Sequence, residues 1–154
     1  MVLDGAMGTM IQRYGLAEED FRGTAFAAHV VKLEGDNDVL NITRPDVIAA
    51  IHREYLEAGA DIITTCTFNA QAISQAEYRT EHLVRRINLA AVAVARAEAD
   101  RMTALTPDRP RFVAGSVGPT GKTASLSPDV DDPAFRAVDF DMLVEAYREQ
   151  IDAL

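Results

Sequence analysis

Two segments of the sequence hold residue types suited to binding a small polar molecule. Residues 4–9 read DGAMGT, in which the glycines let the backbone approach a ligand closely and Asp4 could anchor an ammonium group. In such a loop, an Asp side chain caps the turn through its own backbone at least as often as it binds a ligand. Residues 64–69 read TTCTFN, with more hydroxyl, thiol and amide groups than packing needs. These side chains either recognise a polar ligand or bond to one another inside the fold.

Other chemical motifs in the sequence carry less weight. Residues 115–123 (GSVGPTGKT) are similar to a phosphate-binding P-loop, but the spacing from Gly115 to the Gly-Lys pair is one residue too long. Prolines follow where a P-loop would open a helix. Cys66 has no histidine close in sequence that would activate it, so we expect a packed thiol and not a nucleophile. The three histidines lack metal-ligand spacing and are expected to be solvated or structural.

The hydrophobic pattern predicts that strands and helices alternate along the chain. We expect strands at residues 1–3, 60–66 and 111–117, and helices at residues 44–58, 81–103 and 140–154. Thr43 is predicted to cap the first of these helices, Gly59 to end it and Asp139 to cap the last. The last helix should carry one apolar face, formed by Phe140, Leu143, Tyr147, Ile151 and Leu154.

This alternation predicts an α/β fold with parallel strands and right-handed crossovers, equivalent to the first three βα units of a (β/α)8 TIM barrel. Both common parallel architectures bind ligands at the carboxyl ends of the strands, so residues 4–9, 65–70 and 115–123 should lie together. The last helix reaches Leu154 at an apolar position without a stop signal. We therefore expect residues 1–154 to be one partial domain, truncated from a longer barrel.

Composition excludes several classes of partner. The 154 residues include 15 Lys and Arg against 24 Asp and Glu, for a net charge of −9. Such a charge repels phosphate backbones and anionic lipid surfaces, so we expect neither nucleic acid nor a membrane as a partner. The single cysteine cannot form an internal disulfide, and there is no signal peptide or apolar run long enough to span a membrane. These features favour a cytoplasmic globular protein.

Several stretches, in their order and spacing, resemble the homocysteine S-methyltransferase family of (β/α)8 barrels. The likeness spans nearly the whole chain and favours the cobalamin-dependent branch, the methionine synthases, over betaine-type relatives. The matching stretches are residues 3–12 (LDGAMGTMIQ), 35–38 (GDND), 45–48 (PDVI), 57–63 (EAGADII), 113–120 (VAGSVGPT), 127–130 (SPDV) and 132–133 (DP).

The resemblance implies methyl transfer from methylcobalamin to the sulfur of homocysteine. A thiol with a pKa of about 8.5 is mostly protonated at neutral pH, and in this family zinc binds the sulfur and lowers its pKa. The three cysteines that hold zinc in the family lie in later strands, and Cys66 is not one of them. We therefore expect zinc and methylcobalamin in the full-length enzyme only. This chain should hold no catalytic or metal-binding residue and should be inactive alone.

The same resemblance implies contacts to homocysteine. Asp4 would contact its amino group, the backbone amides of Gly5 and Met7 its carboxylate, and Thr65 would contribute from the second strand. A second acidic partner for the ammonium is expected after the fourth strand, beyond this chain. The implied protein partners are the remaining barrel strands and the cobalamin and folate modules of the full-length protein.

Two residues depart from the family pattern, and three other functions are compatible with the sequence. Thr64 and Cys66 stand where relatives often have Glu and Asn, so the side chains at the second strand depart from the commonest family pattern. The chain could instead be a standalone half-barrel that binds a ligand or oligomerises, or part of a cobalamin-independent homocysteine methyltransferase. An unrelated aldolase-type barrel would need a lysine at a strand end, and Lys122 alone is placed to serve.

Overall fold

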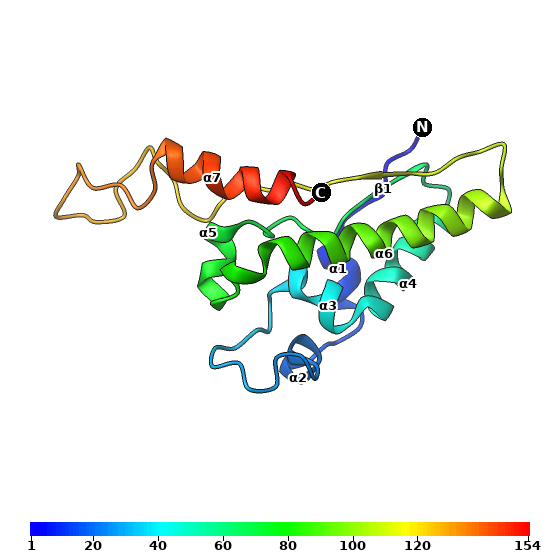
Figure 1. The fold of residues 1–154 in the computed structure, drawn as a ribbon, viewed down its shortest axis with the longest axis horizontal. Coiled ribbons are helices and arrows are strands. Elements are labelled where there is room, and N and C mark those ends of the chain that lie inside the picture. Colours follow the sequence, from blue (N-terminus) through cyan, green and yellow to red (C-terminus); the bar gives the residue numbers. More distant parts are fainter.

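A computed structural model describes residues 1–154 and shows a mixed α/β fold with a small parallel sheet. Strand β1 (Ile62–Thr64) pairs with β2 (Phe112–Ala114), with Ile63 opposite Val113. The amino-terminal segment lies along the other edge of β1 through a single parallel bridge between Leu3 and Ile62 (Figure 1). The α/β class is as predicted, although two paired strands do not by themselves define a barrel.

Helices make up most of the chain. The α-helices are α1 (Met7–Gln12), α2 (Glu18–Arg22), α3 (Leu40–Thr43), α4 (Pro45–Glu57), α5 (Ala72–Gln75), α6 (Val84–Leu105) and α7 (Phe140–Ile151). Short 3₁₀ helices are η1 (Asn37–Val39), η2 (Ala76–Tyr78) and η3 (Glu81–Leu83). The three long helices α4, α6 and α7 lie where the hydrophobic pattern predicts helices, because their apolar stripes and end signals are local in sequence.

Of the three residues predicted to cap or end a helix, two do so in the structure and one does not. Asp139 caps α7, since its carboxylate accepts a 2.8 Å bond from the backbone N–H of Met142. Gly59 follows α4 with a φ of +109°, a conformation that favours glycine. Thr43 does not cap α4: it is the last residue of α3, and α4 begins directly at Pro45, whose fixed φ suits the first helical position.

The strands are shorter than predicted. Residues 65–66 and 115–117, expected to continue β1 and β2, lie outside them, and residues 1–3 contribute only the bridge at Leu3. The physical reason lies just after β1: the amide of Thr67 donates to the carbonyl of Thr65 (3.0 Å), which turns the backbone away from the extended path.

The core occupies one side of the sheet. Helices α4 and α6 pack together and cover β1, with Ile63 fully buried between them and the small residues Ala95 and Ala99 facing inward from α6. The opposite face of the sheet carries the paired positions Leu3, Ile62 and Phe112, and about half of the Leu3 and Phe112 side chains is exposed.

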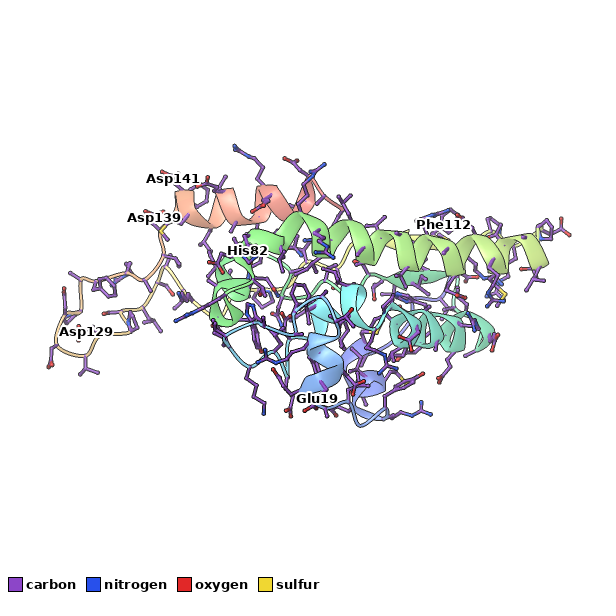
Figure 2. All side chains as sticks on the ribbon, turned by 60° about the horizontal axis from the view of Figure 1, so that its bottom comes forward. Glu19, His82, Phe112, Asp129, Asp139 and Asp141 are labelled. Atoms are coloured by element: carbon purple, nitrogen blue, oxygen red, sulfur yellow. The ribbon has the colours of Figure 1, made fainter.

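Helix α7 lies beside α5 and α6 at the end of a long loop, with Asp129 near the tip of that loop (Figures 1 and 2). Phe140, Leu143, Tyr147 and Ile151 share one face of α7, and much of that face is open to solvent, since Phe140 is 74 % and Ile151 58 % exposed. The residues that pack inward are the small Ala146 and the amide Gln150, which fit closely against α5 and the segment after β1. No helix of the chain is both long and apolar enough to cross a membrane.

Candidate functional site

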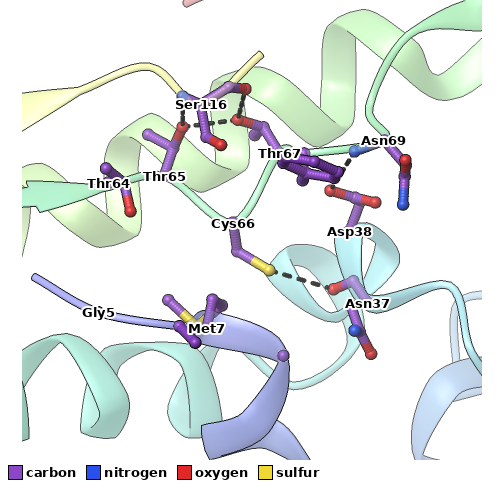
Figure 3. A pocket seen from close by; sticks show the side chains of 13 residues that line it. Gly5, Met7, Asn37, Asp38, Thr64, Thr65, Cys66, Thr67, Asn69 and Ser116 are labelled. Carbon is purple, nitrogen blue, oxygen red and sulfur yellow. Dashed lines mark hydrogen bonds between the residues drawn. The ribbon is translucent and has the colours of Figure 1, made fainter. Parts of the chain in front are cut away.

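A polar cavity of about 340 Å³ opens at the carboxyl ends of β1 and β2. Its wall combines the turn into α1, helix η1, the segment after β1 and one residue after β2 (Figure 3). The lining residues are Gly5, Ala6, Met7, Gly8, Asn37, Asp38, Thr64, Thr65, Cys66, Thr67, Phe68, Asn69 and Ser116. The two segments identified from the sequence therefore border one cavity, as expected where parallel strands end at the same edge of a sheet.

Asp4 lies next to this cavity but is not part of its lining. Its carboxylate accepts hydrogen bonds from the backbone N–H of Thr64 (2.7 Å) and from the Thr64 hydroxyl (3.0 and 3.2 Å). Burial raises the pKa of Asp4, and the bonds from Thr64 oppose that rise. The side chain thus fastens the amino-terminal segment to β1, a contact between residues 60 positions apart that sequence patterns do not reveal.

Gly5 and the turn that follows it rest on the ring of Tyr55 from α4. A Cβ atom at Gly5 would lie 3.0 Å from the Tyr55 hydroxyl oxygen, and this hydroxyl donates to the carbonyl of Ala6 (3.1 Å). Glycine at this position therefore allows a tyrosine to support the turn, in addition to leaving its own backbone accessible in the cavity wall.

The Thr65 hydroxyl belongs to a closed ring of hydrogen bonds that joins the ends of β1 and β2. Thr67 Oγ1 donates to the carbonyl of Ser116 (2.8 Å), so the 2.6 Å contact between the two threonine hydroxyls is donated by Thr65. Thr65 Oγ1 in turn accepts from the amide of Ser116 (2.9 Å). Of the two possibilities left by the sequence, these two hydroxyls follow the second: they bond to each other and to the neighbouring strand.

Two further residues shape the cavity. Buried Asn41 donates from Nδ2 to the carbonyls of Asp38 and Cys66, both at 2.7 Å, and so joins η1 to the segment after β1. At Gly118 a Cβ atom would clash with the carbonyl oxygen of Phe68, to which the Gly118 amide donates (3.0 Å). Sequence reasoning missed Asn41, close to which only the GDND stretch gave a signal, whereas Gly118 lies in the strand-end segment 115–123 that the sequence indicated.

Asp38 and the only thiol, Cys66, border the cavity, and a second buried acid, Asp36, lies close to Asp38 outside the lining. Burial raises the pKa of Asp36 to about 6, and burial together with Asp36 raises that of Asp38 to about 8. Burial and both acids also raise the pKa of the Cys66 thiol well above its ordinary value. The thiol donates to the carbonyl of Asn37 at 3.5 Å. Cys66 is therefore packed and protonated, as the sequence predicts.

The donor set of the cavity does not suit zinc. Zinc prefers thiolate and imidazole ligands, whereas these walls offer hydroxyls, amides, buried carboxyls and one protonated thiol. No group of three or more His, Cys, Asp or Glu side chains is arranged to hold a metal ion. The residues present can bind and orient a small polar molecule through hydrogen bonds.

The chain has a mixed α/β fold with a cavity at its strand ends, the place where α/β proteins commonly bind small ligands. The family model for homocysteine S-methyltransferase matches residues 1–154. The chain therefore belongs to the homocysteine S-methyltransferase family.

Crystal structures of the homocysteine methyltransferase MmuM from Escherichia coli are similar to this chain. The metallated form is 25 % identical, with a TM-score of 0.67, and the match covers 100 % of this chain and 49 % of that chain. The oxidized form is 23 % identical (TM-score 0.69, 100 % and 48 % covered) and the apo form 21 % identical (TM-score 0.62, 100 % and 44 % covered). The chain thus spans about half the length of these structures.

Proposed function

We propose that this chain is the amino-terminal part of a homocysteine-binding barrel whose parent enzyme transfers a methyl group to the sulfur of homocysteine. The family match over residues 1–154 supports the reaction class. The observation that carries the proposal to this chain is the cavity, because residues 5–8 and 64–69 meet there in a polar pocket of a size suited to a small ligand.

Within this proposal, the chain binds and orients the amino-acid end of homocysteine. The backbone amides of Gly5 and Met7 receive the carboxylate, and Asp4, held by Thr64, faces the ammonium. Thr65 keeps the two strand ends in register through its ring of hydrogen bonds. Nothing in the cavity stabilises a thiolate, since its ionisable groups are acids and its only thiol is protonated. Activation of the sulfur is therefore assigned to the part of the parent enzyme outside this chain.

We further propose that the parent is a cobalamin-dependent methionine synthase in which zinc, methylcobalamin and folate are bound by other parts of the protein. The stretches that resemble the family, taken together in their order and spacing, support this branch. A cobalamin-independent homocysteine methyltransferase is the second candidate, since the MmuM structures that match the whole chain are those of a homocysteine methyltransferase. Presenting the parent enzyme with methylcobalamin or with a sulfonium methyl donor such as S-methylmethionine separates the two candidates.

We also propose that further βα units complete the barrel. Two apolar surfaces support this: the half-exposed side chains of Leu3 and Phe112 on the sheet, and the exposed Phe140 and Ile151 on α7. In a closed barrel, neighbouring strands and helices cover such surfaces and pair the open sheet edges.

The Met7 amide provides a direct test of substrate binding. Met7 is the first residue of α1, where proline is tolerated because the helix does not use that N–H. Ala6 before it has φ −66° and ψ 113°, which is compatible with a following proline. Met7→Pro therefore removes one N–H, and Met7→Ala is the matched control that loses the side chain but keeps the amide.

We expect calorimetric titration with L-homocysteine to show binding to the wild-type chain and to Met7→Ala, and affinity at least about tenfold lower for Met7→Pro, as for loss of a hydrogen bond to a charged group. Equal affinities of the two variants would exclude the Met7 amide as a carboxylate ligand. Absence of binding to the wild-type chain would refute the proposed function of this chain.

A further inference from the structure

The Asp38 carboxyl group is an incompletely bonded acid in the wall of the cavity. Its side chain is only 3 % exposed, and it extends from η1 toward the segment after β1 (Figure 3). Oδ1 accepts one long bond from the amide of Asn69 (3.4 Å), and apart from its own backbone amide no other group of the chain bonds to the carboxyl group. A buried carboxyl group normally has several donors, so this one has room for a ligand that donates.

The charges around Asp38 favour a cation as that ligand. Neither Asp38 nor its neighbour Asp36 has a Lys, Arg or His partner within ion-pair distance. The two acids disfavour each other's ionisation, and the whole chain carries a net charge of −9. An anionic group would be repelled here, whereas an ammonium would satisfy the free oxygen and neutralise the buried charge.

We propose that Asp38 receives the ammonium group of the amino-acid substrate. This assignment rests on the proposed function, because it concerns the amino group of homocysteine. An ammonium has three N–H donors, so Asp38 adds to the contact proposed for Asp4 and does not replace it. The Asp4 carboxylate is already bonded to Thr64 and lies outside the cavity lining, whereas Asp38 borders the cavity itself.

Substrate binding should therefore release a proton. With a pKa of about 8, Asp38 is mostly protonated at pH 7, and the arriving ammonium stabilises the carboxylate so that the proton passes to solvent. The ionisable groups that surround it are Asp36 on η1, the Cys66 thiol after β1, and Tyr78 on η2, whose pKa is raised by burial and by both acids. His29 lies beyond them, bonded to the carbonyl of Tyr78 (2.7 Å).

Two ligands isolate the ammonium contact. L-Methionine has the amino group but no thiol that could titrate, and 4-(methylthio)butanoate is the same molecule without the amino group. The variant is Asp38→Asn, which keeps the shape of the side chain. Asp36→Asn is the matched control, because Asp36 is equally buried but bonds to Gln75 and does not line the cavity.

By calorimetric titration at pH 8, Asp38→Asn should bind L-methionine at least about tenfold more weakly than the wild-type chain, with 4-(methylthio)butanoate affected little. Asp36→Asn should bind L-methionine at least as tightly as the wild-type chain, because removing the neighbouring acid favours the Asp38 carboxylate. In the wild-type chain at pH 7, titration in two buffers of different ionisation enthalpy should show release of about one proton per L-methionine and none with the deaminated ligand. The buffer experiment needs no variant to fold.

The outcomes separate the two proposals. Three results would overturn the role of Asp38 and leave the proposed function intact. They are an equal loss of affinity for both ligands in Asp38→Asn, unchanged L-methionine binding in that variant, and no proton release in the wild-type chain. If neither L-methionine nor L-homocysteine binds to the wild-type chain, the proposed function fails and the role of Asp38 fails with it.

Discussion

His52 is expected to make the stability of this chain fall in acid. It lies on α4, fully buried, and neither ring nitrogen has a hydrogen-bond partner. Burial lowers its pKa from 6.5 to about 4, with a small opposing effect from Glu98. The folded chain therefore holds a neutral imidazole at pH values where the unfolded chain binds a proton. The stability that depends on the neutral His52 imidazole is fully present above pH 6.5 and is lost as the pH falls through 6.5 toward 4.

The size of this effect follows from the two pKa values. Between pH 7.5 and pH 4.5, linkage through His52 should reduce the free energy of unfolding by about 2.5 kcal/mol. In His52→Leu, which has a similar volume and no titrating group, this component is absent. The variant should also gain about 1 kcal/mol at pH 7.5, because an unpartnered polar group no longer has to be buried.

Urea unfolding of wild type and His52→Leu at both pH values measures the effect. The stability difference between the two proteins should be about 2.5 kcal/mol larger at pH 4.5 than at pH 7.5, and the contributions of the other acids cancel in that comparison. His82→Leu removes an exposed imidazole and is the matched control. A stability difference between wild type and His52→Leu that is the same at both pH values would refute the argument.

Two further predictions concern the hydrogen-bond ring and the activity of the chain. Thr65→Val leaves the Ser116 amide without its acceptor and removes the bond that Thr67 Oγ1 accepts, so it should cost about 1–3 kcal/mol in urea unfolding. Thr65→Ser keeps the hydroxyl and should lose less. Equal stability of the two variants would show that the ring contributes nothing. The purified chain, supplied with zinc, methylcobalamin and homocysteine, should form no methionine by mass spectrometry, because Cys66 is its only cysteine and its thiol is protonated; turnover would contradict the assignment of sulfur activation to the rest of the parent enzyme.

Local signals were enough to predict the long helices and the place of the cavity. The apolar spacing in α4, the proline at its start and the cap at Asp139 all act within a few residues. The meeting of residues 4–9 with residues 64–69 follows from parallel strands, whose carboxyl ends share an edge.

Contacts between distant residues could not be predicted in the same way. The bond from Thr64 to Asp4 and the two bonds of Asn41 depend on how separate elements pack. The direction in which the apolar face of α7 points could not be predicted for the same reason: periodicity shows that a helix has an apolar side, but it does not show which neighbours are available to cover it.

Gln150 connects the wall of the cavity to helix α7 through hydrogen bonds. From the buried side of α7, its amide nitrogen reaches the carbonyls of Thr67 (2.7 Å) and Ser116 (3.4 Å), the same segment ends that the threonine ring joins. A shift of α7 would therefore pull directly on the pocket wall. Any element that packs on the outer face of this helix is in a position to tune ligand affinity without touching the ligand.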